Sequence, residues 1–234
     1  MSKFNRYARE LDGAVKAYFE RYKAAQQKVK DLDDKIEEVN EDIREFHRTG
    51  NADKEWLAKS RLAALQVNRK QAENEFSNVK KGNFEVHKQI KEVRSRLEAE
   101  CNAAFALDPD AIDPGFFTLL NSGFVKPADF EALWSKAEKA GNVTMLRLIA
   151  DSAGHEAESQ RSKGNYDAAS KLNALAAQSR NYSTAGVLDR FDELGFVAKY
   201  ALGDPQSPQS DRAFPNPVFY DKWDELCSEA IEAF

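Results

Sequence analysis

The chain has 234 residues, a formal net charge of −5, 31% charged residues and a mean hydropathy of −0.66. Its two cysteines, Cys101 and Cys227, lie far apart without CxxC spacing, which argues against a disulfide framework or a zinc site. No run of about 18 apolar residues occurs, and the opening MSKFNRYARE lacks the apolar core of a signal peptide, so we expect a cytoplasmic protein without a membrane contact.

An apolar repeat runs through the first 46 residues at alternating steps of four and three. Its members are Phe4, Ala8, Leu11, Val15, Tyr18, Tyr22, Ala25, Val29, Leu32, Ile36, Val39, Ile43 and Phe46. A second repeat runs from Ala58 to Leu97, and it pairs with the first so that the two residue numbers in each pair add to 101. This register makes a positions face d positions in an antiparallel pair. The sequence therefore predicts an all-α protein whose residues 1–107 form a long antiparallel helical hairpin, a two-helix coiled coil.

The turn of this hairpin is expected between Gly50 and Asn51, at the midpoint of the pairing. Glycine suits the position that follows a helix, and Asn51 or Asp53 can cap the next helix. At 1.5 Å per residue, the paired part of the first helix is roughly 60 Å long. Gly82 is the expected weak point of the second helix, because glycine is a poor helix former.

Two layers of the predicted seam break the apolar pattern, since Tyr18 is paired with Asn83 and Leu32 is paired with Arg69. A polar group in a seam can fix the register of two helices at some cost in stability, although it can also belong to a binding site. We favour the register interpretation for both layers.

Charge and apolar surface outside the seam bear on the partners of the hairpin. Residues 1–107 carry 22 Lys and Arg against 19 Asp and Glu, whereas residues 108–234 carry 12 against 20, so the net charges are +3 and −8. The Lys and Arg of the arm alternate with acids, as on a solvated face, so nucleic-acid binding is not expected.

Four aromatic residues are expected to leave apolar surface outside the seam and to favour a homo-oligomer formed along the arms. They are Tyr7, Phe19, Trp56 and Phe84.

A proline-rich segment at residues 108–114 ends the long helix, and Asp113 with Pro114 is suited to begin a new one. Short helices bounded by glycine or asparagine are expected over 114–122, 127–140, 142–162, 165–180 and 183–202. Together they predict a compact helical domain over residues 108–203, large enough to hold a modest core.

Residues 204–216 form a polar, proline-rich segment that we interpret as a linker. The chain closes with an amphipathic helix, expected over residues 217–234, whose other face is acidic. Either this helix folds back and completes the core, which we favour, or it is a tethered peptide that docks in a groove of a partner. The candidate partner-binding residues on its apolar face are Phe219, Trp223, Leu226, Ile231 and Phe234.

No catalytic motif is present in the sequence. The patterns GxGxxG, GK[ST] and GxSxG do not occur, and His155 with Glu158 is the nearest approach to a metal cluster, among ordinary polar residues. We therefore expect no catalytic residues, no cofactor and no metal.

Four segments resemble uncharacterised helical coiled-coil proteins of phages and prophages of Gram-positive bacteria. They are Tyr7–Asp12, Phe116–Phe124, Pro127–Leu133 and Asn142–Ala150. The resemblance carries no active site, because these residues look like helix caps and core positions. It implies an origin in a phage and, for a coiled-coil protein without enzymatic motifs, a role in head or tail assembly, including scaffolding.

These observations predict a non-enzymatic phage structural or assembly protein that acts by protein–protein contact through its coiled-coil arm. Capsid or portal proteins are the candidate partners, and the host cytoplasm or the virion is the expected location. The alternative is a phage-encoded intracellular protein that binds and inhibits or adapts a host protein. In that case the −8 charge of residues 108–234 could mimic nucleic acid.

Overall fold

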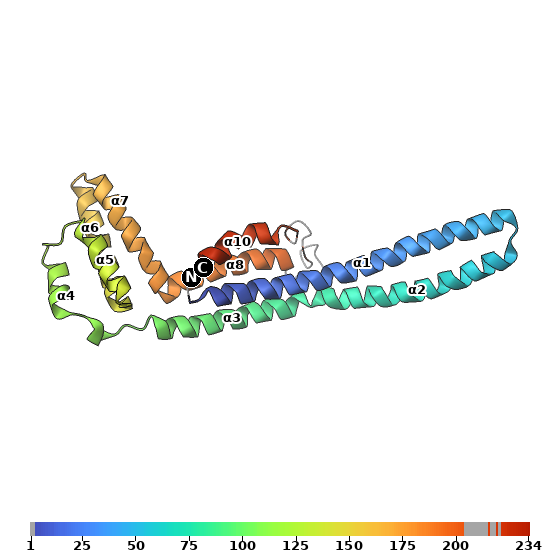
Figure 1. Ribbon diagram of the computed structural model, residues 1–234, viewed down its shortest axis with the longest axis horizontal. Helices are drawn as coiled ribbons and strands as arrows, with labels where there is room; N and C mark the ends of the chain where they lie inside the picture. The colour runs from blue at the N-terminus through green and yellow to red at the C-terminus, as the bar shows by residue number, and fades with distance from the viewer. Residues whose placement is uncertain (1–2, 204–214, 216–218, 220) are drawn as a thin grey trace. The chain divides into compact units, whose positions relative to one another are not determined.

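The computed structural model describes residues 3–203, 215, 219 and 221–234, and every regular element among them is a helix (Figure 1). The predicted all-α class is therefore confirmed. By its internal packing the chain divides into a first unit, residues 1–93 and 194–233, and a second unit, residues 94–193 with Phe234. These limits differ from the predicted domain boundaries after residues 107 and 203, and the predicted linker 204–216 lies, apart from Pro215, outside the described residues.

The first unit contains a long helical hairpin made of α1 (Asn5–Thr49) and α2 (Ala52–Lys81). Between them Gly50 has a φ of 69°, in the left-handed region that a residue without Cβ adopts at little cost. The side chain of Asn51 accepts a hydrogen bond from the backbone N–H of Lys54 (3.3 Å), as an N-cap does. The predicted position and chemistry of the turn are confirmed.

A break at Gly82 separates α2 from α3 (Asn83–Ala104), at the predicted weak point. A Cβ on Gly82 would lie 3.0 Å from the carbonyl oxygen of Val79 and 3.6 Å from the ring of Tyr18. The Tyr18 hydroxyl donates to the carbonyl oxygen of Lys80 (3.1 Å), in the last turn of α2. Tyr18 therefore fits its seam position because its hydroxyl has an acceptor beside the break.

Contacts between α1 and α2 follow the predicted antiparallel pairing. Lys28 forms an ion pair with Glu75 (2.5 Å), and Arg69 forms one with Asp33. The rings of Tyr22 and Phe76 lie 5.1 Å apart. These contacts are compatible with the predicted long hairpin, whereas regular coiled-coil packing along its seam stays a prediction.

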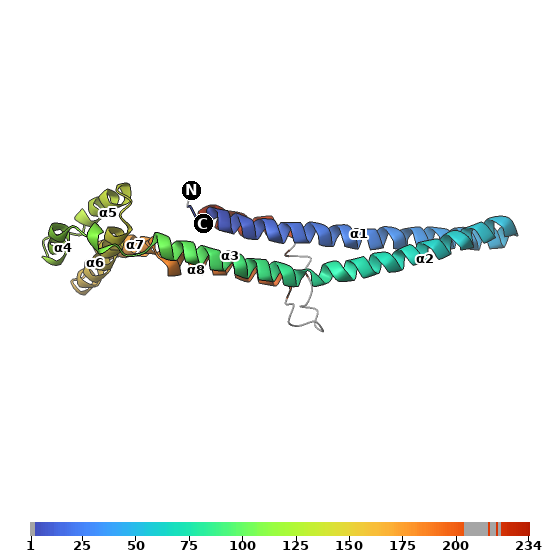
Figure 2. The same cartoon turned by 90° about the horizontal axis from the view of Figure 1, so that it is seen from below.

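The seam is buried to two different depths. Leu11 and Val15 on α1 are fully buried, at 0% exposure, and Val86 on α3 is nearly so. Closer to the turn most seam residues, among them Val29 on α1 and Phe76 on α2, are only half-buried, although the small or central residues Val39, Ala58 and Ala72 stay buried. The difference arises because two further helices cover the base of the hairpin and do not reach the rest of it (Figures 1 and 2).

One of these helices is α10 (Trp223–Ala233), which lies along the first part of α1. The ring of Trp223 packs edge-on against Phe19 at 6.2 Å, and its indole N–H donates to Asp12 (2.8 Å). The amide of Asn5 donates to the carbonyl oxygen of Ile231 (2.7 Å). These contacts favour the interpretation in which the terminal helix folds back, and they place it on α1.

The other covering element is the second half of α8 (Thr184–Leu202), which lies along α3 in the first unit. Asn83 donates to the carbonyl oxygen of Leu202 (3.3 Å), and a ring nitrogen of His87 lies 2.9 Å from the carbonyl oxygen of Gly203. Gly195 lies next to Ile90. α8 and α10 cover the same face of the hairpin, as the two views of the chain show (Figures 1 and 2).

The second unit is built around α4 (Pro114–Asn121), α5 (Asp129–Lys139), α6 (Val143–Ser162) and α7 (Tyr166–Ala177). Short 3₁₀ turns lie at Pro109–Ala111 and Gln178–Tyr182. The predicted helices agree with these bounds to within a few residues, apart from the end of the helix expected over 165–180, where a 3₁₀ turn replaces the last residues. The core residues of this part come from all four helices, with α6 contributing the most.

The helix ends of the second unit follow the capping chemistry that the sequence indicates. Asp113 accepts hydrogen bonds from the backbone N–H groups of Gly115 and Phe116. Asn142 caps α6 by accepting from the N–H of Met145 (2.9 Å). Glycines with positive φ follow α4, α5 and α6, at Gly123, Gly141 and Gly164. Among the described residues, no helix is both long and apolar enough to cross a membrane.

Candidate partner-binding surfaces

Two of the five predicted partner-binding residues are core residues. Trp223 and Phe234 are each 2% exposed. Trp223 packs on α1 in the first unit, and in the second unit the ring of Phe234 lies 6.2 Å from that of Phe191. Neither side chain is available on the surface in this conformation, so both stabilise the fold as it stands.

The other three predicted residues are more accessible. Leu226 is 46% exposed on α10. Ile231 is half-buried, and Phe219 is half-buried with its ring 6.4 Å from that of Tyr200. Partner binding by the terminal helix stays a prediction, and Leu226 is the member of the set that a partner can reach directly.

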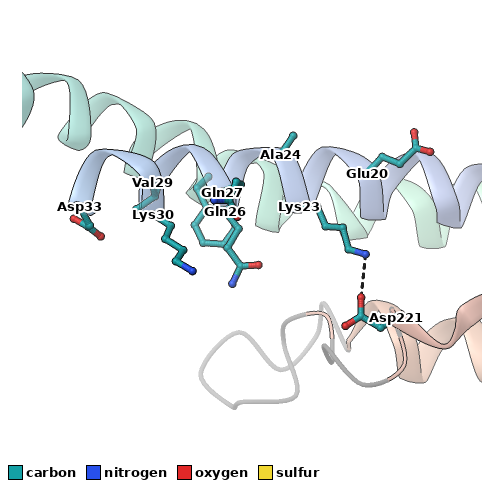
Figure 3. Close-up of a pocket in the computed structure, with 10 residues that line it drawn as sticks. Glu20, Lys23, Ala24, Gln26, Gln27, Val29, Lys30, Asp33 and Asp221 are labelled. Atoms are coloured by element: carbon teal, nitrogen blue, oxygen red, sulfur yellow. Dashed lines mark hydrogen bonds and ion pairs between the residues drawn. The ribbon is translucent and has the colours of Figure 1, made fainter. Parts of the chain in front are cut away.

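An open groove of about 970 Å³ continues along the hairpin from the N-terminal end of α10 (Figure 3). It is lined by Glu20, Lys23, Ala24, Gln26, Gln27, Val29, Lys30, Asp33, Phe76 and Asp221. Val29 and Phe76 are seam residues and supply an apolar surface. Lys23, Lys30 and Asp33 point to the side of α1 on which Asp221 lies. We call this surface the open groove.

Lysines and carboxylates pair where α10 meets α1. Lys23 lies 2.9 Å from Asp221, and Lys16 lies 2.6 Å from Asp224 and 3.0 Å from Asp12. Hydrogen bonds to Asp224 and then to Asp12 raise the pKa of Lys16 above its ordinary value. These exposed pairs contribute little stability each, but they fix which charges face each other.

A second groove lies on the opposite flank of the same two helices. It is lined in part by Lys28, Asp31, Lys35 and Glu75, and its volume is about 540 Å³. The ion pair between Lys28 and Glu75 crosses this flank. The half-buried seam is therefore accessible from both sides along the part of the hairpin that α8 and α10 do not cover.

The expected apolar surface outside the seam is found at two of its four positions. Tyr7 and Phe19 are buried, and Phe19 is covered by Trp223 of α10, so the expectation is wrong for them. Trp56 is 68% exposed close to the turn of the hairpin, and Phe84 is exposed on α3. The sequence could not separate the two pairs, because the covering helix is more than 200 residues away in the chain.

Arg94 on α3 forms its hydrogen bonds within the protein. In the second unit, the guanidinium of Arg94 forms two hydrogen bonds with Asp192 (2.7 and 2.8 Å) and one with Glu98 (3.3 Å). This bidentate geometry ties α3 to α8. The guanidinium of Arg94 therefore stabilises the fold and is not available to bind a polyanion such as nucleic acid.

Both cysteines are buried, and neither forms a disulfide. Burial first, and then the nearby carboxylates of Asp12 and Asp224, raise the pKa of the Cys227 thiol to about 11. A thiol with such a pKa is protonated at neutral pH, so Cys227 acts as an apolar core residue of α10 rather than as a nucleophile.

No protein-family model, curated protein or solved structure matches this chain. Its function is therefore argued from its own surfaces. Among these, sequence reasoning did not single out the row Lys16, Lys23 and Lys30, although its spacing of seven residues is a visible signal.

Proposed function

We propose that this protein is a non-enzymatic structural or assembly protein of a phage, which acts by protein–protein contact through the arm formed by α1 and α2. Capsid or portal proteins are the proposed partners, in the host cytoplasm or in the virion. The resemblance of its sequence to phage and prophage proteins supports the origin, and the absence of a catalytic motif in its sequence supports the non-enzymatic role.

The observation that carries this proposal is the change in burial along the seam. Leu11 and Val15 are fully buried where α10 lies on α1, whereas Val29 and Phe76 are half-buried where no further described helix covers the hairpin. Two helices can bury only one stripe each, so the apolar surface that remains favours packing against a further helix. That helix comes from a second copy of the chain or from a partner.

The alternative is a phage-encoded intracellular protein that binds and inhibits or adapts a host protein. The observation that favours it is the net charge of −8 on residues 108–234, which contrasts with +3 on residues 1–107. An acidic surface of this kind can compete with nucleic acid for a basic host protein.

Quantitative mass spectrometry of purified particles separates the two functions. A structural protein is expected at a fixed copy number per particle, and a scaffolding protein is expected in assembly intermediates that contain capsid or portal protein. A chain that is missing from both, and that co-purifies with one host protein from infected cells, supports the alternative. Genes for capsid and portal proteins next to its own gene would favour the assembly role.

A further inference from the structure

We propose that the open groove of the arm binds an acidic amphipathic helix of a partner protein, placed end to end with α10. The contact rests on the proposed function, in which the arm binds proteins, and it specifies the chemistry of the partner. Continuity with a surface that is already occupied, the charge of the groove and its apolar floor each support it.

The open groove continues a helix-binding surface that the chain itself fills. α10 lies along the first part of α1, and Asp221, which precedes it, lines the near end of the groove through its ion pair with Lys23 (Figure 3). Past this point the face of the hairpin is the same, but no described residue of the chain covers it. A helix that enters the groove thus finds the surface that α10 uses.

The charges that line the groove favour an incoming helix that carries a carboxylate. Lys16, Lys23 and Lys30 are spaced by seven residues, so they form one row along α1. The first two pair with Asp224 and Asp221, whereas Lys30 has no ion-pair partner among the described residues. Three acids line the groove: Asp33 is paired with Arg69, Asp221 is paired with Lys23, and Glu20 points to the other side of α1 (Figure 3).

The apolar floor of the groove favours apolar residues on the same incoming helix. Under α10 the seam residues Leu11 and Val15 are fully buried, and in the groove Val29 and Phe76 still have part of their surface in water. A docked helix removes this apolar surface from water, which is the favourable term in most helix-in-groove contacts.

Residues 221–234 show that one sequence can meet both requirements, because they combine buried Trp223 and Cys227 with five acidic residues against one lysine. A second copy that presented this same face would instead bring a row of lysines against a row of lysines. Charge therefore favours an acidic helix of another protein over self-association through this face.

A labelled peptide with the sequence of residues 219–234 is the probe, and its binding to the full chain is measured by fluorescence anisotropy under reducing conditions. Lys30→Glu places a negative charge in the groove. Lys35→Glu makes the same change of charge on the opposite flank of α1, where Lys35 lines the other groove, and serves as the matched control. Both lysines are exposed, so neither change should affect folding, which circular dichroism checks.

We expect saturable binding of the peptide that Lys30→Glu weakens by roughly five- to tenfold and Lys35→Glu changes by less than about twofold, since reversing a charge removes one attraction and adds a repulsion. Three results would overturn the proposal. The first is no binding of the peptide at all, and the second is an equal loss of affinity in Lys30→Glu and Lys35→Glu, which indicates unspecific charge attraction. The third is a loss of affinity with Lys16→Glu and none with Lys30→Glu, which indicates that the peptide displaces α10.

The outcome is separable from that of the proposed function. A chain that is found in particles with capsid or portal protein but does not bind the peptide keeps its assembly role and uses another face. A chain that binds the peptide through Lys30 but is missing from particles and assembly intermediates keeps this groove and loses the proposed role.

Discussion

The side-chain amide of Asn83 donates a hydrogen bond to the carbonyl oxygen of Leu202, the last residue of α8 (3.3 Å). The last carbonyls of a helix have no helical partner, and Leu202 is followed by Gly203 with a φ of 80°. Asn83 is 3% exposed, so its amide and this carbonyl meet out of contact with water. A residue that breaks the apolar pattern of one helix thus caps another helix.

Asn83→Leu should therefore destabilise the protein. The replacement leaves the carbonyl of Leu202 without this donor, and a buried polar group that loses its hydrogen bond costs about 1–3 kcal/mol. From the sequence alone the opposite is expected, namely equal or higher stability with a looser register, because leucine suits a seam. Urea denaturation measures the difference. Asn68→Leu, at an exposed position of α2, is the control and should change stability by less than about 0.5 kcal/mol.

The two depths of the seam predict two sizes of effect for truncation to alanine. Leu11→Ala, in the part covered by α10, should cost about 2–5 kcal/mol, as is usual for a fully buried leucine. Phe76→Ala should cost less than the roughly 3–5 kcal/mol of a buried phenylalanine, because Phe76 is half-buried in the open groove. Denaturant midpoints of both variants provide the test. Equal or larger loss for Phe76→Ala would mean that the groove is filled, for instance by a second copy.

The fold could be predicted from the sequence wherever it depends on near neighbours. The turn at Gly50 and Asn51 and the break at Gly82 are local features of residue chemistry. The pairing of Lys28 with Glu75 follows from periodicity. By contrast, the partner of Asn83 lies 119 residues away and that of Asp12 lies 211 residues away. No spacing in the sequence connects such residues.

The candidate site was only partly predictable for the same reason. The apolar face of the terminal helix was visible, and so was the folded-back arrangement as one of two interpretations. Whether Trp223 or Leu226 would face the core depends on the surface of α1 that α10 covers, and Phe19 looks no different in sequence from exposed Trp56. The open groove lies beside the start of α10 at Trp223, where no other described residue covers the hairpin, and this is a tertiary property.

The register of the hairpin predicts a specific disulfide. After Cys101 and Cys227 are replaced by alanine, cysteines at Val15 and Val86 should form an intramolecular bond under mild oxidation. Both valines are buried in the first unit and are paired in the predicted seam, where facing residues come within disulfide range. Mobility on a non-reducing gel shows the bond. Cysteines at Val15 and Ile90, about one turn out of register, are the control, and more efficient bridging there would contradict the predicted pairing.

The raised pKa of Cys227 predicts a loss of stability at alkaline pH. In the unfolded chain the thiol releases its proton near pH 9, whereas in the folded chain its pKa is about 11. Between these values the folded state binds more protons than the unfolded state, so the free energy of unfolding falls as pH rises. This contribution is fully present below about pH 9 and is lost as pH rises toward 11.

Urea midpoints of the wild type and of Cys227→Ala at pH 8, 9.5 and 10.5 isolate this effect. Tyrosines also titrate in this range, among them Tyr182, whose pKa is raised to about 12 by burial and by its hydrogen bond to Glu138. The comparison removes their contribution, because they are present in both proteins. The difference in stability between wild type and variant should shrink with increasing pH. A constant difference would show that Cys227 is not held as a buried neutral thiol.

The position of α10 predicts how the protein responds when its terminal helix is altered. Trp223→Ala should cost about 3–5 kcal/mol, because it removes a buried ring from the surface of α1. Leu226→Ala, three residues along the same helix but exposed, is the matched variant and should change stability by no more than about 0.5 kcal/mol. If the terminal helix also binds a partner, Leu226→Asp should reduce capture of capsid or portal protein without this loss of stability.

Deletion of residues 204–234 extends the same test to the whole terminal helix. For a tethered peptide that binds partners, the deletion should abolish partner capture and leave the denaturation curve unchanged. For the packed helix that the structure shows, it uncovers α1 around Phe19 in the first unit and removes Phe234 from Phe191 in the second. We therefore expect a lower urea midpoint and faster trypsin cleavage at Lys16, which loses its pairing with Asp224. In the intact protein, a cut between Gly203 and Pro217 should leave the terminal fragment bound on gel filtration, and prompt release of that fragment would show that α10 is not held on α1.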